Sequence, residues 1–556
     1  MMAGTDRQLN SGKCGGLPAG RGKRLRVKRM RRGGMVLFIV VIFVTLLSLA
    51  GLSYVALMST EHKAVRLRGD ELQVEMAVGS GAEMMCAHLQ QKSKPATSTI
   101  RANRSASDES QFRGVVVMDD DTGRRTRFSI VAPKIEDDRV TGIRFGMSNE
   151  SARLNLAVLP EWDERVPGSA RAALMTLPNM SQSIADAILD WVDRDTTARQ
   201  FGAEASYYAG LNVPYGPRNA EPTSLEELLL VRDVTRDLLF GADENCNYQI
   251  DAGEQSQASS GTLSSAGAAE IPWSMLLTVF SAEKNLNPDG GPKIDLNERD
   301  LASLHAKLAK VVDADLAKFI ILCRQYRQVN PESSPGRNVS LSRVELDFSV
   351  RGRYPFASVL DLLGAAVEIR ASDEARTRQT IRSPMTANSQ VFRETLPALL
   401  DQVSIGGDRV IRGRINLLEA SEDVLVAVPG VTEELARRIT TQRQVASSGD
   451  GESRRHPTWL LADGLVDLAQ MKSLLPYVTC GGDVYRAQIV GFFDEQGPVS
   501  RAEVVIDATS VPARQVYYKD LRLLGRGFSI DALRGTTAGV PEPLEAPKPL
   551  EAAEWE

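Results

Sequence analysis

The sequence predicts an α+β fold with a long N-terminal helix, an antiparallel sheet and a large, mainly helical domain inserted into that sheet. Three observations support this. Residues 36–60 contain no Asp, Glu, Lys, Arg or His. Alternating, valine-rich segments bounded by Asp and Gly occur before residue 150 and again after residue 480, as antiparallel strands require. Between these segments, apolar residues recur with a helical period.

Basic residues gather at the N-terminus. Residues 1–34 hold ten Lys and Arg and one acid, Asp6, so this segment carries +9. The formal charge of the chain is -5, and subtracting +9 leaves -14 for the remainder. The remainder of the chain, which we call the body, is therefore acidic. An acidic body repels nucleic acid and anionic membranes, and it is compatible with binding cations.

The apolar segment 35–60 is long enough to cross a bilayer. Its twenty-five residues 36–60 span about 37 Å as a helix, whereas the hydrocarbon core is about 30 Å thick. The basic side of the segment places residues 1–34 in the cytoplasm and the body across the membrane. Residues 61–95 continue as an amphipathic helix, since Glu61–Lys92 contains no proline and has apolar residues at helical spacing.

The glycine pair Gly33-Gly34 allows three interpretations of this N-terminus. A cleaved secretory signal needs a shorter apolar core and a small-residue exit, which residues 53–59 lack. A signal-anchor is the plain alternative. We favour a prepilin-type leader, cut between Gly34 and Met35, because the helix continues well beyond the membrane segment.

The expected organisation follows the chain in seven parts. They are a leader (1–34), a transmembrane helix (35–60), its amphipathic continuation (61–95), the first strands of the sheet (112–150), the inserted mainly α domain (151–475), strands that complete the sheet (480–535) and a disordered tail (536–556). Within the inserted domain, Ile271–Val279 and Val344–Val350 have strand-like patterns.

Residues 413–443 predict a helix, a Pro-Gly hairpin and a second helix. Residues 153–188 repeat this pattern, and we interpret the two segments as copies of a helix-hairpin-helix-like unit. In DNA-repair proteins such hairpins bind phosphates, usually through a second glycine. Here Thr432 replaces that glycine and two glutamates follow. In an acidic chain this favours a packing motif over DNA binding.

Residues 243–254 have the spacing of a calcium-binding loop. Oxygen-bearing side chains occupy positions 1, 3, 5, 7, 9 and 12, namely Asp243, Asn245, Asn247, Gln249, Asp251 and Glu254. Tyr248 stands where such loops have glycine, so the loop requires either a strained backbone at this residue or another shape. A polar turn without an ion is the alternative.

The order of motifs in the inserted domain resembles the minor pseudopilin K of type II secretion systems, also called general secretion pathway protein K. The matching segments are Ile188-Leu-Asp-Trp-Val-Asp193-x-Asp195, Gly202-Ala-Glu204, Tyr207-Tyr208 and Leu225-Glu-Glu-Leu-Leu-Leu-Val-Arg232. The resemblance implies a pilin-like fold, N-methylation of Met35, calcium binding and a single-pass location in the inner membrane. It also implies four kinds of partner: the I- and J-type minor pseudopilins, the major pseudopilin, the inner-membrane secretion platform and a prepilin peptidase.

Ile39 is the fifth residue after the predicted cut, where major pilins carry Glu. The lack of that Glu is a feature of K subunits, and it suits the first position at a filament tip. The resemblance therefore predicts a subunit that initiates a pseudopilus and supports export of folded proteins. The chain shows no catalytic motif, and we expect no enzyme activity. A signal-anchored periplasmic protein with nucleic-acid-binding hairpins, as in DNA uptake, is the alternative.

Overall fold

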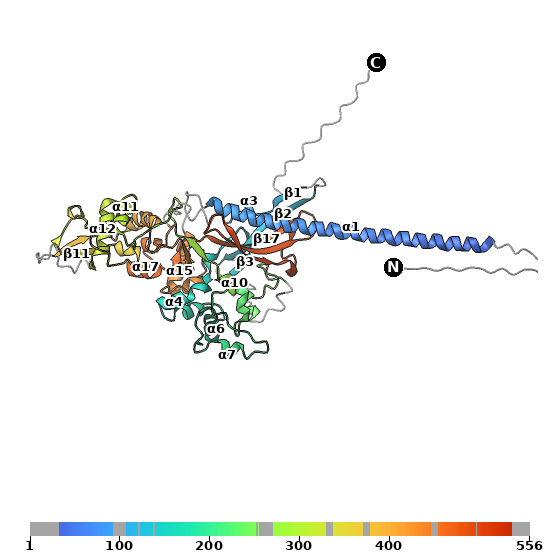
Figure 1. Cartoon of the computed structure of the whole chain (residues 1–556), viewed down its shortest axis with the longest axis horizontal. Coiled ribbons are helices and arrows are strands. Elements are labelled where there is room, and N and C mark those ends of the chain that lie inside the picture. The colour runs from blue at the N-terminus through green and yellow to red at the C-terminus, as the bar shows by residue number, and fades with distance from the viewer. Residues whose placement is uncertain are drawn as a thin grey trace, which may run out of the picture. The chain divides into compact units, whose positions relative to one another are not determined.

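The structure is a computed structural model that describes residues 33–92, 107–119, 123–136, 139–251, 254, 271–329, 337–370, 378–445, 454–495 and 497–535 (Figure 1). The predicted leader up to residue 32 and the predicted tail lie outside these ranges. The chain divides into two compact units, Met1–Arg68 and Gly69–Glu556. In the described part, Cys86, Cys246, Cys323 and Cys480 form no disulfide.

Helix α1 runs from Gly33 to Lys92 and belongs to both units. In the first unit its described side chains are exposed, and the helix is long and apolar enough to cross a membrane. Two polar side chains of this segment are satisfied locally. The hydroxyl of Thr45 donates to the carbonyl oxygen of Ile42 at 2.8 Å, and that of Thr60 to Leu57 at 2.7 Å. Because these hydroxyls need no other acceptor, they suit an apolar environment.

Among the described residues, seven strands form the main sheet, in the order β1-β2-β17-β18-β19 with β3 beside β2 and β4 beside β17. The strands are β1 (Val115–Asp119), β2 (Arg125–Glu136), β3 (Arg139–Phe145), β4 (Ser148–Asn149), β17 (Val484–Phe493), β18 (Ser500–Asp507) and β19 (Arg514–Asp520). All of these pairings are antiparallel. Strands from both sides of the inserted domain therefore share one sheet, which confirms the predicted α+β fold.

The second-unit part of α1 packs against this sheet (Figure 1). Its buried residues Ala77, Val78, Met85 and Leu89 share a core with side chains of β2 and β17. Two short helices border the sheet, α3 (Glu109–Phe112) and α18 (Ile530–Arg534). A second core on the other face of β17 includes Leu533 of α18.

Helix α1 and the sheet approach each other closely at Gly491 of β17. A Cβ atom there would overlap the carbonyl oxygen of Val74 and lie 3.3 Å from the Cβ atom of Ala77. We expect Gly491→Ala to lower the free energy of unfolding by about 1–3 kcal/mol, because the helix must move off the sheet. Chemical denaturation measures this. Gly79→Ala is the control, since a Cβ atom at this helical position meets nothing within 4 Å and should stabilise slightly. Equal effects of the two substitutions would contradict the prediction.

The inserted domain consists of many short elements. Its first part contains η1 (Glu150–Ala152), β5 (Leu154–Asn155), η2 (Leu156–Val158), α4 (Leu159–Arg165), α5 (Ser169–Leu174), α6 (Gln182–Val192), α7 (Ala205–Tyr208), η3 (Leu225–Leu230), α8 (Arg236–Phe240), α10 (Trp273–Leu276) and β6 (Leu277–Thr278). Its middle part contains β7 (Ala282–Lys284), β8 (Ile294–Asp295), α11 (Leu301–Leu308), α12 (Ala314–Gln325), β9 (Gln328–Val329), β10 (Arg337–Asn338), η4 (Leu341–Arg343), η5 (Val359–Leu362), β11 (Ala366–Arg370), β12 (Arg378–Arg382), η6 (Val391–Thr395), α13 (Leu396–Gln402), β13 (Val403–Ser404) and β14 (Val410–Arg412). Its last part contains β15 (Ile415–Asn416), α14 (Glu422–Val426), α15 (Glu433–Val445), α16 (Trp459–Ala462), α17 (Leu468–Leu474) and β16 (Val478–Thr479), and η7 (Arg522–Leu524) follows β19.

Two strand predictions in the inserted domain are wrong. Residues 271–279 contain helix α10, and only Leu277–Thr278 are a strand, because Trp273 turns inward and its indole donates to the Pro178 carbonyl oxygen at 2.9 Å. Residues 344–350 form a loop. The side-chain amide of Gln325 donates to the carbonyl oxygens of residues 347 and 350, which binds the loop to the end of α12 instead of to a sheet.

A buried ion-pair network joins the inserted domain to the sheet. The carboxylate of Glu150 in η1 accepts from Arg486 of β17 at 2.8 and 3.1 Å, and Arg153 lies 3.4 Å away. Thr278 of β6 also donates to it. Burial alone would raise the pKa of Glu150, but the charges of Arg486 and Arg153 lower it to about 2. The carboxylate is therefore charged in the interior, where it links η1, β6 and β17.

Candidate metal centre

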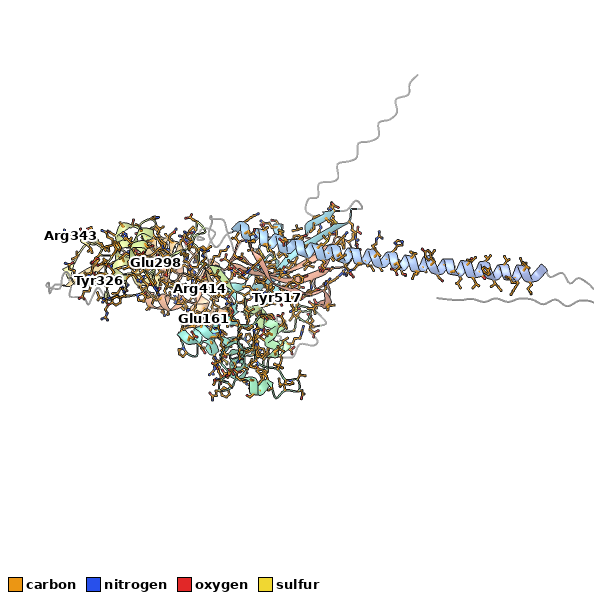
Figure 2. All side chains as sticks on the ribbon, viewed as in Figure 1. Glu161, Glu298, Tyr326, Arg343, Arg414 and Tyr517 are labelled. Atoms are coloured by element: carbon orange, nitrogen blue, oxygen red, sulfur yellow. The ribbon has the colours of Figure 1, made fainter. Side chains whose placement is uncertain are left out.

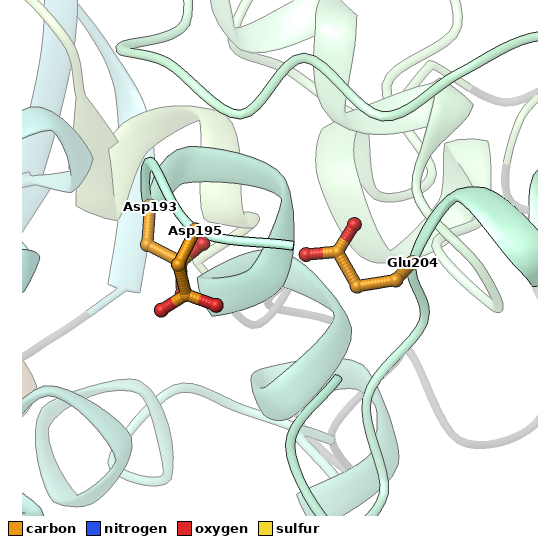
Figure 3. Close-up of side chains that lie close together, drawn as sticks. All are labelled: Asp193, Asp195 and Glu204. Carbon is orange, nitrogen blue, oxygen red and sulfur yellow. The ribbon is translucent and has the colours of Figure 1, made fainter. Parts of the chain in front are cut away.

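Three carboxylates meet at the C-terminal end of helix α6 (Figure 3). Asp193 follows the last residue of the helix, Asp195 lies two residues further, and Glu204 precedes α7. Each offers an oxygen atom, and these atoms lie within 4.8 Å of one another. Asp193 and Asp195 lie at the start of the segment that joins α6 to α7, and Glu204 lies at its end. We call these three residues the acidic cluster.

Two buried aspartates of α6 hold the loop that carries this cluster. Asp190 accepts from the backbone N–H of Arg199 at 3.2 Å and from its guanidinium at 2.8 Å. Asp186 accepts from Arg171 and from the backbone N–H of Phe201 at 3.1 Å. The carboxylate of Asp190 also leaves no room for a Cβ atom at position 202, which is glycine. Helix and loop are thus fixed before any ion binds.

Oxygen atoms in the acidic cluster are buried without hydrogen-bond partners among the described residues. Asp193 and Glu204 are 7% and 4% exposed, yet Oδ1 of the first and Oε1 of the second accept no hydrogen bond. The same holds for Oδ1 of the neighbouring Asn219, whose Nδ2 donates to the backbone oxygen of Asp195 at 2.7 Å. Buried polar atoms are rarely left unsatisfied, so these oxygens are available to accept from a further donor or to bind a cation.

The pKa shifts of the acidic cluster also reflect the burial of its carboxylates. Burial raises the pKa of Asp193 to about 6; the charges of Asp195 and Asp190 add to the rise, and Arg199 opposes it. Burial also raises the pKa of Glu204; the backbone N–H of Ala205 and the side chain of Asn219 oppose the rise, and the charges of Asp190 and Asp195 add to it. The charged forms are therefore destabilised unless a cation compensates them. Because the donors are carboxylate and amide oxygens, they suit a hard cation such as calcium better than zinc.

The sequence motifs noted around this site come together in space. The indole of Trp191 donates to Glu227 at 3.0 Å, and its ring meets that of Tyr208 edge to face. The guanidinium of Arg232 donates to the backbone oxygen of Gly202 at 2.9 Å. The motif residues thus support the loop of the acidic cluster. The cluster itself was not predicted, although Asp-x-Asp followed by Glu204 was a visible signal, because pattern alone gives no burial.

The predicted calcium loop closes on itself through hydrogen bonds. The carboxylate of Asp243 accepts from the backbone N–H of Asn247 at 3.0 Å and of Tyr248 at 2.7 Å. Glu254 accepts from the backbone N–H groups of residues 244, 245 and 251. The amides of Asn245 and Asn247 donate to Asp251 at 2.7 and 3.2 Å. Five of the six proposed ligands therefore gather, whereas the side chain of Gln249 is exposed.

Tyr248 adopts the conformation that glycine normally takes in such a loop. Its φ is 63°, in the left-handed region, so the backbone is strained, as one of the two predicted options required. The loop is also bound to the sheet, because Gln488 and Arg501 donate to the backbone oxygens of Cys246 at 2.7 Å and Asn245 at 2.6 Å. Burial raises the pKa of Asp243 to about 6. Calcium binding by this loop stays a prediction.

The predicted processing site lies at the start of α1. The helix begins at Gly33, two residues before Met35, so the described helix includes both sides of the predicted cut. Met35 and Ile39 are exposed. Cleavage after Gly34 and the role of Ile39 stay predictions.

A long apolar helix, an antiparallel sheet that packs on its second half, and a helical domain inserted into that sheet together define an α+β, pilin-like fold. Residues 152–240, which contain the acidic cluster, match the family "Type II secretion system (T2SS), protein K". The chain therefore carries the type II secretion system protein K domain, which confirms the resemblance inferred from its motifs.

Two known proteins are similar to the chain. Type II secretion system protein K of Aeromonas hydrophila is 31% identical over 114 residues, which cover 18% of this chain and 34% of the relative. The chain thus matches about a third of that protein's length. The second is a chain in the crystal structure of the GspK-GspI-GspJ complex from the enterotoxigenic Escherichia coli type 2 secretion system. It has 10% sequence identity and a TM-score of 0.35, and the match covers 82% of this chain and 99% of that chain.

Proposed function

We propose that the chain is a minor pseudopilin that sits at the tip of a type II secretion pseudopilus, starts its assembly and supports export of folded proteins. The observation that carries the proposal is the protein K domain at residues 152–240 in a chain with an apolar N-terminal helix. Ile39 in place of Glu supports the tip position. The proposed partners are the I- and J-type minor pseudopilins, the major pseudopilin and the inner-membrane platform, with the body in the periplasm. The proposed role is structural rather than enzymatic.

Removal of the leader is the first test of this proposal. In cells with an active prepilin peptidase, we expect the mature chain to begin with N-methylated Met35, because the peptidase cuts after glycine. Mass spectrometry of the purified N-terminus measures this. Gly34→Leu should block the cut, whereas Gly33→Ala, one residue further away, is the matched control and should still be processed. A wild-type chain that retains residue 1 would exclude the pseudopilin proposal.

We also propose that the inserted domain binds calcium. The acidic cluster of Asp193, Asp195 and Glu204 is the stronger candidate, because two of its buried carboxylates have an oxygen without a partner. In the 243–254 loop, hydrogen bonds already engage both oxygens of Asp243 and of Glu254. Calcium at either site would stabilise the domain rather than take part in a reaction.

Nucleic-acid binding is the less favoured function. In the α14–α15 hairpin, Glu433 begins α15 with a side chain that is 76% exposed. A phosphate group at this helix terminus would meet its carboxylate. We expect the body to show no salt-sensitive DNA binding.

A further inference from the structure

Three segments of the inserted domain begin and end with the same pairing of short parallel strands. In the described residues, β5 pairs with β6, β8 with β13, and β15 with β16. The registers are equivalent: Leu154↔Leu277 and Asn155↔Thr278, Ile294↔Val403 and Asp295↔Ser404, Ile415↔Val478 and Asn416↔Thr479. We name these segments repeat 1 (154–278), repeat 2 (294–404) and repeat 3 (415–479).

Each repeat opens with the same local turn. In each repeat an Arg or Lys is followed by Leu or Ile, then by Asn or Asp, and then by Leu. The three segments are Arg153-Leu-Asn-Leu, Lys293-Ile-Asp-Leu and Arg414-Ile-Asn-Leu. The side-chain oxygen of the Asn or Asp accepts from the backbone N–H two residues further on, at 2.9, 2.9 and 3.0 Å in repeats 1, 2 and 3. This agreement in sequence, hydrogen bond and strand register indicates copies of one unit.

The long helix of each repeat carries the same buried pattern. After the residues Ser181, Asp313 and Thr432, the third, fourth and seventh positions are Ile184-Ala185-Ile188, Leu316-Ala317-Ile320 and Leu435-Ala436-Ile439, all buried. Repeats 2 and 3 also share a contact between distant residues. Arg324 of α12 donates to the backbone oxygen of Leu296 at 2.5 Å, and Arg443 of α15 donates to that of Leu417 at 3.3 Å. These arginines, and the leucines they bind, occupy equivalent positions.

The chain enters and leaves repeat 2 through a two-stranded stem. Strands β7 and β14 are antiparallel, with Lys284 opposite Val410. Beyond the strands, the backbone N–H of Asn285 donates to the oxygen of Arg409 at 2.8 Å. Residues 286–408, which we name the middle module, therefore begin and end at neighbouring points. A two-residue turn can close such a hairpin.

The middle module buries many apolar residues and makes polar contacts with repeat 3. Its buried residues include Leu296, Leu304, Leu308, Phe319, Ile320 and Leu360. Toward repeat 3 it forms ion pairs, Arg393–Asp463 at 3.0 Å, Asp361–Lys472 at 3.0 Å and Asp401–Arg455 at 2.8 Å. The apolar core is continuous across this boundary, but the ion pairs resemble an interface between domains. In Figure 2, Arg343 and Tyr326 of the module lie at the end away from Tyr517 of the sheet.

We propose that the middle module, which contains repeat 2, is an additional copy of the repeat inserted through the stem. We further propose that it is an accessory domain, which the rest of the body does not need in order to fold. Any interaction that the module makes then takes place on its own surface. The proposal does not depend on the assignment to a pseudopilus, since it rests on registers, hydrogen bonds and the stem.

The test is to replace residues 286–408 of the full chain by Asn-Gly and to purify the variant in detergent. We expect a folded protein, with a cooperative transition and near-ultraviolet circular dichroism signals for its tryptophans, all of which lie outside residues 286–408. The control replaces residues 418–476, inside repeat 3, by the same dipeptide. That variant should not fold, because β15 and β16 are parallel and a two-residue turn cannot join them. Failure of the first variant to fold, or equal behaviour of the two, would overturn the proposal.

Hydrogen exchange in the unshortened chain gives a second, independent result. Phe319→Ala opens a cavity in the middle module, and we expect amide exchange in α12 to accelerate at least tenfold while β17 and α6 keep their rates. Equal acceleration in all three elements would mean that the body folds as one cooperative unit, and the accessory-domain proposal would then be wrong.

Discussion

Replacing Glu150 by Gln is expected to lower the free energy of unfolding by about 3–5 kcal/mol, the cost of leaving buried charges without their partner. Glu150 is fully buried, and its carboxylate compensates the charge of Arg153 and, together with Glu503, that of Arg486. Denaturant titration measures the loss. Glu109→Gln is the control, because Glu109 pairs with Arg113 at the surface and its side chain is 63% exposed. Such pairs contribute about 0–1 kcal/mol.

The pH dependence of this loss has a definite sign. The pKa of Glu150 is about 2 in the folded chain and about 4.3 in an unfolded one. The stabilisation is therefore complete above the unfolded value and is lost as the pH falls toward 2. The difference between wild type and Glu150→Gln should shrink between pH 5 and pH 2. A difference that stays constant over this range would show that charge is not its cause.

Calcium is expected to raise the thermal midpoint of the wild-type chain. At a free concentration of 100 times the dissociation constant, the gain is about 2.7 kcal/mol. The double variant Asp193→Asn, Glu204→Gln should lose this gain and be about as stable as wild type in chelator, because loss of the Asp193–Arg199 ion pair offsets the removal of two buried charges. Thermal unfolding with and without calcium measures both effects. A variant that keeps the full gain would exclude the acidic cluster as the binding site.

The loop variants Asp243→Ala and Glu254→Ala serve as the comparison for this prediction. Calorimetric titration with calcium separates the two sites, since heats that are unchanged in these variants would remove the 243–254 loop from consideration. Protonation adds a further check. The pKa of Asp193 is raised to about 6, so without calcium its contribution to stability is present at low pH and is lost as the pH rises through 6. The gain from calcium should accordingly shrink below pH 6.

The fold was predictable where one local signal dominates. The apolar segment predicted α1, and alternating residues on both sides of the inserted domain predicted the shared sheet. Prediction failed where a contact between distant residues decides the structure. Trp273 is held by the carbonyl oxygen of Pro178, and residues 344–350 are held by Gln325, neither of which is visible in a local pattern.

At the candidate site, too, local sequence motifs were predictable and the contacts between distant residues were not. The motif residues of 188–232 were recognised as a set, but burial and orphan oxygens distinguish Asp193 and Glu204 from other acidic residues, and only a folded structure gives these. Repeat 2 was missed because its hairpin has Lys310-Val311-Val312 where repeat 3 has Pro429-Gly430-Val431. The repeats became visible through equivalent registers and hydrogen bonds.

The pairing of β2 with β17 imposes an order on folding. Arg127 at one end of this pairing bonds Asp494, a residue 367 positions later in the chain. During synthesis the N-terminal helix and β2 are made first, and the edge of β2 that pairs with β17 stays open until residues 484–493 follow. Compaction of the inserted domain before that point would shorten the loop that the sheet has to close. The surface on which α1 packs is therefore completed last, so a subunit that ends early would keep its helix undocked.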